Sequence, residues 1–198
     1  MIKRSFDILF SSLGILLLLP VFLVIGALIS FDSKGGVIYK QQRVGLEGKL
    51  FGLFKFRTMR SGSDKQGLLT IGSADDRITP IGLWLRKYKL DEFLQLINIF
   101  KGDMSFVGPR PEVPKYVLHY TLDQRKVLTV KPGLTDPASL AYLNESDLLA
   151  QAKDPEQYYI LYIMPAKLDL NLSYIEQQNL VKDISIILRT IGRIMQRR

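Results

Sequence analysis

Residues 8–31 read ILFSSLGILLLLPVFLVIGALISF, and this uncharged run decides what kind of fold the chain can adopt. It is long enough to cross the hydrocarbon core of a bilayer, which takes about 20 residues of α-helix. A cleavable signal peptide is the alternative, but the apolar run is too long for one, and no small-residue cleavage site follows it before the basic segment. We therefore expect a membrane helix that the chain retains.

The charges on both sides of this run are basic. Lys3 and Arg4 precede it, and Lys34 is the first of several cations that follow it. Basic flanks favour the cytoplasmic side of a membrane, and Pro20, near the middle, removes a backbone donor and bends or breaks a helix. These features predict a re-entrant helix over residues 1–34 that is broken at the proline and returns to the cytoplasmic face. A kinked helix that spans the bilayer is the alternative.

Composition limits the partners and the chemistry. A chain of 198 residues has room for one domain with a real core, here residues 35–198, which we expect to form one functional unit with the membrane helix. The 27 Lys and Arg against 19 Asp and Glu give a net charge of +8, which favours anionic lipids, phosphorylated substrates or nucleic acid. The absence of Cys excludes disulfides, thiolate metal sites and Cys nucleophiles, and a single His excludes zinc sites built from several histidines.

Two β-prone runs follow the membrane segment. Residues 37–44 and 50–58 are joined by a glycine-containing turn at 45–48, which predicts a small β-hairpin. Lys55 and Arg57 fall on one face of the second run, so we expect a stripe of two cations there. By default such a stripe is a solvated face.

A helix is predicted from Thr79-Pro80 to the residue before Gly102, because proline fits the first turn of a helix and glycine its end. The preceding segment, 60–76, is rich in Gly, Ser and Asp and predicts a mobile loop. Apolar residues recur along the helix at helical spacing, so we expect it to be mostly buried. These residues are Leu83, Leu90, Leu94 and Ile97.

The acidic pair Asp91-Glu92 lies on this predicted helix, where carboxylates are costly to bury unless positive charge faces them. Ion pairs with neighbouring cations of the same helix, such as Arg86, are one explanation. Separate roles for the two acids are the other, because adjacent helical residues project about 100° apart. Residues 102–111, GDMSFVGPRP, then hold Arg110 between two prolines, a rigid mount that suits a bidentate contact between its guanidinium and a phosphate.

The C-terminal part of the chain predicts several helices. Residues 145–172 read as helical pieces broken at Pro155 and Pro165. Residues 179–198, NLVKDISIILRTIGRIMQRR, predict a basic amphipathic helix that lies at a membrane interface, and a core-facing helix is the alternative. The apolar stripe of this helix comprises Ile184, Ile187, Leu188, Ile191 and Met195.

Three segments resemble the monotopic phosphoglycosyl transferases of the bacterial sugar transferase family: KFRTM (55–59), LDEFLQLINIFKGDMSFVGPRP (90–111) and VKPGLT (130–135). Together with the N-terminal and C-terminal helices, the resemblance spans nearly the whole chain. It implies an α+β, mostly helical fold with a re-entrant membrane helix, a small hairpin, a catalytic helix and interfacial amphipathic helices. It also implies transfer of a sugar phosphate from a nucleoside diphosphate sugar, with UDP as the expected nucleotide, to polyprenyl (undecaprenyl) phosphate. The site of this first membrane step of glycan assembly would be the cytoplasmic face of the bacterial inner membrane.

Residue by residue, the resemblance implies that Asp91 is the nucleophile and that Glu92 is its acidic partner and the ligand of magnesium. A carboxylate that attacks phosphorus forms an acyl phosphate and splits the transfer into two displacements. Mg²⁺ neutralises the leaving phosphate and needs only one or two carboxylates besides substrate oxygens. Direct attack by polyprenyl phosphate, without a covalent intermediate, would use the same residues. The candidates for contacting the donor phosphates are Lys55, Arg57, Arg86 and Arg110.

Two segments depart from the family pattern. Residues 136–145, DPASLAYLNE, stand where many members have a Gly-x-x-Gln-Val-Asn-Gly-Arg-like stretch, so the sequence predicts neither the sugar nor the nucleotide firmly. Leu19 stands before Pro20 where a serine is frequent. A catalytically silent membrane-surface scaffold is the rival class, and it predicts that the acidic pair is dispensable. A nucleic-acid binder is disfavoured, because residues 8–31 have no role in it and no binding module is recognised. The sequence does not predict the oligomeric state.

Overall fold

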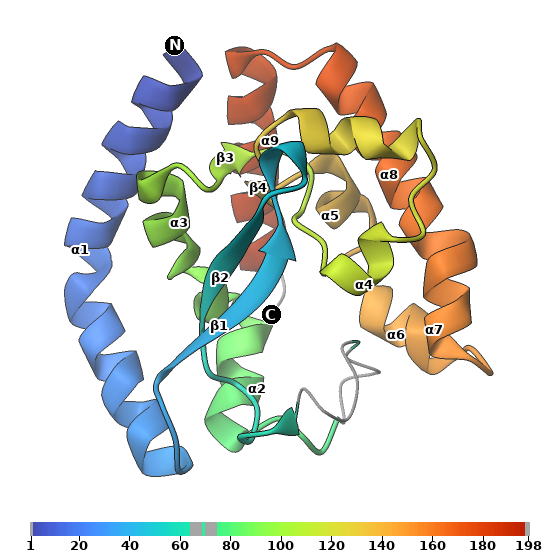
Figure 1. Ribbon diagram of the computed structural model, residues 1–198. Helices are drawn as coiled ribbons and strands as arrows, with labels where there is room; N and C mark the ends of the chain where they lie inside the picture. Colours follow the sequence, from blue (N-terminus) through green and yellow to red (C-terminus); the bar gives the residue numbers. More distant parts are fainter. Residues whose placement is uncertain (1, 64–68, 70–74, 197–198) are drawn as a thin grey trace.

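The computed structural model describes residues 2–63, 69 and 75–196, which form a largely helical molecule with two small β-sheets (Figure 1). The α+β, mostly helical class is confirmed. Most of the loop predicted at 60–76 lies outside the described residues. The elements are α1 (Ile2–Asp32), β1 (Ile38–Val44), η1 (Leu46–Gly48), β2 (Leu50–Phe56), α2 (Pro80–Lys87), η3 (Leu90–Glu92), α3 (Gln95–Lys101), β3 (Ser105–Val107), α4 (Pro114–Val117), η4 (Gln124–Thr129), β4 (Gly133–Thr135), α5 (Pro137–Ala141), α6 (Glu145–Ala150), α7 (Pro155–Tyr158), η5 (Tyr159–Ile163), α8 (Met164–Glu176) and α9 (Leu180–Gln196).

The long N-terminal helix α1 runs down one side of the molecule, and Figure 1 shows it changing direction partway along. It contains Pro20 without interruption, so the structure shows no break at the proline, and the re-entrant path stays a prediction. Among the described residues it is the one helix long and apolar enough to cross a membrane. Its outward side chains are apolar and exposed, among them Leu9, Leu16, Leu23 and Phe31. The uncharged run at residues 8–31 therefore forms a helix with an apolar outer surface.

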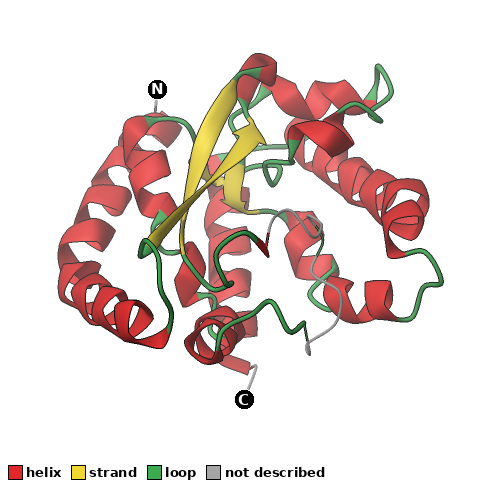
Figure 2. Cartoon of the chain, turned by 60° about the horizontal axis from the view of Figure 1, so that its bottom comes forward, coloured by secondary structure: helices red, strands yellow, loops and turns green. Residues whose placement is uncertain are grey.

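The predicted hairpin is confirmed. β1 pairs antiparallel with β2, from Ile38 opposite Phe56 to Val44 opposite Leu50. Its strands cross the molecule between α1 and α3 on one side and the C-terminal helices on the other (Figure 1, Figure 2). Leu53 is buried in the hydrophobic cluster that joins β2 to α3. The hairpin is thus the central element against which both halves of the molecule pack.

The helix predicted from residue 80 to 101 has the predicted ends. Thr79 Oγ1 accepts a hydrogen bond from the amide of Gly82 at 3.0 Å, which caps α2. Gly102, with φ of 95°, ends α3 in the left-handed conformation that glycine adopts without strain. Local signals therefore located both termini.

The middle of this segment differs from the prediction of one continuous helix, which is wrong. Lys89 takes a left-handed φ of 58°, which ends α2, and the next three residues form the tight turn η3 before α3 begins. Leu83 on α2 is 47% exposed and not buried as predicted, whereas Leu94 lies in the core between α1 and β2. The acidic pair lies on a turn and not on the face of a helix, so the predicted catalytic helix is replaced by a short turn between two helices.

Two short parallel strands, β3 and β4, lie next to the segment that carries Arg110. They approach closely because two glycines face each other: a Cβ on Gly108 would lie 2.4 Å from the carbonyl oxygen of Lys131, and one on Gly133 would lie 2.1 Å from the amide nitrogen of Gly108. Such distances exclude any side chain. The two glycines therefore fix the Gly108–Pro111 loop against the Lys131–Thr135 segment.

The C-terminal helices form the other side of the molecule. Pro155 begins α7 as expected, but the predicted break at Pro165 is wrong, because helical backbone continues from α7 through η5 into α8. η5 is a π-helical turn, and Pro165 follows it in the first turn of α8, where a missing backbone donor does little harm. On α9 the predicted apolar stripe is largely exposed, and its exposed members are Ile184, Leu188, Ile191 and Met195. The opposite face, with Asp183 and Ile186, is buried.

Candidate active site

Three of the predicted site residues meet at the turn η3. Lys55 on β2 places Nζ 3.3 Å from Oε1 of Glu92. Arg110, from the loop after β3, donates through Nη2 to the same Oε1. The side chain of Glu92 is 12% exposed, so one buried carboxylate oxygen holds two cations from separate segments. The explanation of the acidic pair by ion pairs along one helix therefore fails for Glu92, because its partners come from elsewhere in the fold.

The charges of this cluster are set by one another. Burial alone would raise the pKa of Glu92, but Arg110 and Lys55 outweigh it and hold the pKa well below its usual range. The Glu92 carboxylate in turn raises the pKa of Arg110. Burial lowers the pKa of Lys55 to about 8, although Glu92 opposes the shift. At neutral pH Glu92 is ionised. Of the two cations that contact it, Lys55 loses its proton at the lower pH.

Asp91 is in a different state from its neighbour. Its side chain is buried, and among the described residues Oδ1 has no hydrogen-bond partner. Burial raises the pKa of Asp91, and the negative charge of Glu92 raises it further, while Lys55, Lys89 and Arg86 oppose the shift. The turn thus carries one carboxylate held by cations and one with a free, more basic oxygen. Two adjacent acids with unlike environments are typical of divided chemical roles.

Arg86 stands beside Asp91 in the last turn of α2. Its Nε donates to Oγ1 of Thr58 at 2.9 Å. Burial lowers the pKa of Arg86, and the Asp91 carboxylate is the strongest charge that opposes this. Arg86 is therefore placed with the acidic pair, as predicted for a residue of the same site.

The structure does not bring Arg57 to this cluster. β2 ends at Phe56, and the Arg57 side chain is buried against the end of α1, so the predicted stripe of two cations on β2 is wrong. Its Nη2 donates to the carbonyl oxygen of Ser33 at 2.6 Å and to the Ser33 hydroxyl at 3.0 Å. A cation at this position satisfies carbonyl groups that the end of a helix leaves free.

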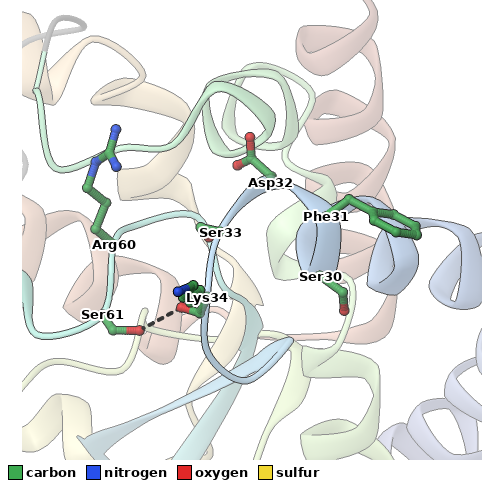
Figure 3. Close-up of a pocket in the computed structure, with 7 residues that line it drawn as sticks. All are labelled: Ser30, Phe31, Asp32, Ser33, Lys34, Arg60 and Ser61. Carbon is green, nitrogen blue, oxygen red and sulfur yellow. Dashed lines mark hydrogen bonds between the residues drawn. The ribbon is translucent and has the colours of Figure 1, made fainter.

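A pocket lies at the same end of α1, and it contains neither acid of the pair (Figure 3). Figure 3 shows Ser61 donating to the carbonyl oxygen of Lys34, at 3.2 Å, across its rim. The pocket is lined by Ser30, Phe31, Asp32, Ser33, Lys34, Arg60 and Ser61. The acidic pair therefore does not line this pocket.

Lys3 and Arg4, predicted as the basic flank of the membrane segment, contact the rest of the molecule. Lys3 Nζ donates to the carbonyl oxygen of Val107 at 2.8 Å. Arg4 donates to the carbonyl oxygens of Ile99 and Phe100 at 2.6 and 2.7 Å, respectively. These cations bind the end of β3 and the end of α3, which the sequence did not predict.

Sequence reasoning missed Arg43 and Glu112. Arg43 Nη1 donates to the carbonyl oxygen of Pro111 at 2.9 Å and lies 3.3 Å from Oε1 of Glu112. Both partners of Arg43, Pro111 and Glu112, directly follow Arg110 in the chain. The approach depends on the end of β1, where the amide of Val44 donates to the carbonyl oxygen of Glu112 at 2.8 Å. No spacing in the sequence signals this contact, because it joins segments that are far apart in the chain.

The acidic pair fits magnesium only as a ligand shared with a substrate. Among the described residues there is no group of three or more Asp, Glu, His or Cys side chains arranged to hold a metal ion. Glu92 is ionised and offers hard carboxylate oxygens. Mg²⁺ keeps several waters and binds through one or two carboxylates together with substrate phosphates. One ionised carboxylate therefore meets the need of a magnesium–diphosphate complex.

Comparison with known proteins shows which family the chain resembles. Undecaprenyl-phosphate glucose phosphotransferase of Komagataeibacter xylinus is 34% identical, with 96% of this chain and 35% of that protein aligned. UDP-glucose:undecaprenyl-phosphate glucose-1-phosphate transferase of Klebsiella pneumoniae is 37% identical, with 87% of this chain and 38% of that protein aligned. Exopolysaccharide production protein ExoY of Rhizobium meliloti (strain 1021) is 33% identical, with 98% of this chain and 85% of that protein aligned.

The chain thus spans well under half the length of the first two of these relatives and most of the third. The family described as bacterial sugar transferase matches residues 1–197, which is almost the full sequence. The segments that carry the acidic pair, Lys55 and Arg110 all lie within this match. The chain belongs to the bacterial sugar transferase family.

Proposed function

We propose that the protein is an enzyme that transfers a sugar 1-phosphate from a UDP-sugar to undecaprenyl phosphate, with release of UMP. The names of two relatives carry this substrate pair, a UDP-sugar in one and undecaprenyl phosphate in both. The observation that supports it most is the divided acidic pair: Asp91 has a buried, unpartnered carboxylate oxygen, and Glu92 holds two cations. This arrangement suits nucleophilic attack on a phosphorus atom that basic side chains surround.

Asp91 acts as the nucleophile in this proposal. Its Oδ1 attacks the sugar-proximal phosphorus of the donor, the bond to the bridging oxygen breaks, and UMP leaves with that bond's electron pair. The sugar phosphate is then an acyl phosphate on Asp91. An oxygen of undecaprenyl phosphate attacks the same phosphorus and the acyl phosphate bond breaks, which gives undecaprenyl diphosphate sugar and restores the carboxylate. The raised pKa of Asp91 supports this role, because a more basic carboxylate is a better nucleophile.

Lys55, Arg86 and Arg110 bind the donor phosphates. Arg110 suits this role because its loop is fixed by Gly108 and because its side chain is 28% exposed and not fully buried. When a diphosphate arrives, Lys55 and Arg110 exchange part of their contact with Glu92 for contact with phosphate oxygens. Glu92 keeps the cations in place until then, so the site does not have to gather them as the substrate binds.

Glu92 would hold magnesium as its protein ligand, together with oxygens of the donor phosphates. Bound in this way, the metal ion would supply charge neutralisation for the departing UMP phosphate. Glu92 supports this role because its pKa is well below the usual range, so it remains an ionised oxygen ligand across physiological pH.

The protein acts at the cytoplasmic face of the inner membrane, with both ends of α1 on that side. Contacts of both helix ends with the same body support this: Arg4 binds the end of α3, and Arg57 binds the other end of α1 at Ser33. The exposed apolar stripe of α9 adds a surface that anionic lipids and acyl chains would cover, since basic residues flank it.

The test is a donor-only reaction. Incubated with a panel of nucleotide sugars and Mg²⁺ but no acceptor, the wild-type protein is expected to release about one equivalent of UMP per active site with one donor, and the adduct is expected to map to the peptide that contains Asp91. Asp91→Asn should lose both signals, because the amide has nearly the same shape but is a far weaker nucleophile. Asp123→Asn changes an exposed acid directly before η4; it is the matched control and should behave as wild type.

Three results would point elsewhere. If UMP appeared only when undecaprenyl phosphate was present, and no adduct formed, direct attack by the acceptor would replace the covalent route. If Asp91→Asn kept full turnover, Asp91 would not be the nucleophile; if the wild-type protein turned over no nucleotide sugar, a catalytically silent membrane-surface scaffold would replace the enzyme.

A further inference from the structure

The first turn of α1 is bound to three other segments through one ammonium group. Lys3 Nζ donates to the carbonyl oxygen of Val107 at 2.8 Å, to the hydroxyl of Tyr174 at 3.1 Å and to Oδ2 of Asp183 at 2.6 Å. These acceptors come from β3, α8 and α9. A Lys ammonium has three donors, and all three are used here. Tyr174 and Asp183 are buried and share a further hydrogen bond, so the cluster is a built feature of the fold.

The second turn of α1 also contacts β3. Asp7 is buried, and its Oδ1 accepts from the hydroxyl of Ser105 and from the amide of Phe106, each at 3.1 Å. Three consecutive residues of β3, from 105 to 107, are therefore held by two side chains of the membrane helix. Arg4 binds the end of α3 in addition. The start of α1 thus joins the segment after the acidic pair to the segment before Arg110.

The residues that α1 holds lie close to Arg110 in the chain. Val107 is three residues before Arg110, and Gly108 and Pro109 stand between them. Proline has a fixed φ, and Gly108 is confined by the backbone of Lys131, so the backbone between Val107 and Arg110 has little conformational freedom. A shift of Val107 would pass into the loop and move the guanidinium that contacts Glu92.

We propose that Lys3 is a positioning residue for Arg110: the first turn of the membrane helix holds the end of β3, and with it the Gly108–Pro111 loop, so that Arg110 faces Glu92. Seating of α1 and assembly of the phosphate-binding site are then linked through one side chain. The kinetic part of the test rests on the proposed transferase function, whereas the structural part does not.

The test uses the double variant Lys3→Met/Asp183→Asn in the full-length protein, reconstituted in lipid nanodiscs. Removing both charges avoids an unpaired buried carboxylate, which alone would destabilise the fold. Hydrogen exchange of the peptide that covers residues 105–111 should accelerate at least about fivefold, and KM for the active UDP-sugar should rise about tenfold with kcat within about twofold. Tenfold is the effect of losing one hydrogen bond from a charged donor. Lys3→Arg should restore both quantities to within about threefold of wild type.

Two controls separate positioning from general stability. Lys126→Met/Asp123→Asn removes an exposed ion pair of the same composition and should change neither quantity. Tyr174→Phe disturbs the same buried cluster but leaves the Lys3 contact with Val107, so it should lower the melting temperature without raising KM. If its KM rose as much as that of the double variant, the effect would be one of stability and the proposal would fall.

Unchanged exchange over 105–111 in the double variant would overturn the positioning role, whatever the kinetics. Should the wild-type protein turn over no nucleotide sugar, the transferase proposal would fail, and the exchange measurement would still decide the role of Lys3. Accelerated exchange with Lys3→Met/Asp183→Asn and its recovery with Lys3→Arg would then support the proposal.

Discussion

Lys55 offers a test of the phosphate-binding cluster through pH alone. Burial lowers its pKa to about 8, with Glu92 opposing the shift and Arg110 adding to it. The ammonium form exists below this pKa and is lost above it. With a pKa of about 8, roughly nine tenths of the molecules carry the charge at pH 7 and roughly one tenth at pH 9. If the ammonium binds the donor diphosphate, kcat/KM for the UDP-sugar should fall about tenfold over this range.

The assay is UMP release at low donor concentration, saturating undecaprenyl phosphate and constant ionic strength, because exposed charges are screened by salt. Glu92 does not contribute to the fall, since its pKa lies well below the range. Lys55→Arg keeps its charge to pH 9 and should give a flat profile. Lys55→Met should also be flat, and at pH 7 it should be about tenfold or more below wild type, the loss expected for one charge-assisted hydrogen bond.

The variants also define the result that would refute the reasoning. A fall for Lys55→Arg as steep as for wild type would mean that another group titrates. A wild-type profile that stayed level to pH 9, with Lys55→Met impaired, would mean that the ammonium binds phosphate but that its pKa is not lowered.

Two further predictions concern the membrane helix and the metal ion. Ser5→Cys and Lys34→Cys, in a chain with no native Cys, should each react with a membrane-impermeant thiol reagent only from the cytoplasmic side, because both ends of α1 bind the same body; labelling of either from the other side would contradict the re-entrant path. Chelation should abolish turnover, and Glu92→Gln should raise the magnesium concentration for half-maximal turnover about tenfold, since a neutral amide is a poorer ligand for a hard dication; an unchanged titration would place the metal ion elsewhere.

The parts of the fold that the sequence predicted correctly rest on local chemistry. Thr79 caps its own helix and Gly102 ends the next one, in each case through backbone geometry within a few residues. The hairpin follows from a glycine turn between two β-prone runs, and its register needs no distant partner. Such features can be predicted because the interactions that fix them lie inside the segment that shows the pattern.

The errors arose where a distant contact overrides local preference. Lys89 has an ordinary helix former's side chain, yet it takes the left-handed conformation and separates α2 from α3. Nothing within the segment predicts this, because the turn is held by charges from β2 and from the loop after β3. Glu112 and Arg43 were missed for the same reason, since only the pairing of chain segments brings them beside Arg110.

The cations that stood out in the sequence divide into two groups in the structure, and the division bears on how the membrane helix lies. Lys55, Arg86 and Arg110 surround the acidic pair. Arg4, at the start of α1, binds a backbone carbonyl at the end of α3, and Arg57 binds a backbone carbonyl just after the end of α1. A helix of 31 residues that spanned a bilayer would place its ends on opposite sides. One body of polar loops and charged side chains cannot reach both sides without crossing the lipid, which costs several kcal/mol for each unsatisfied backbone group. If the contacts of Arg4 and Arg57 hold in the membrane, we expect both ends of α1 on one side, and this prediction of a re-entrant path rests on those contacts more than on a break at Pro20.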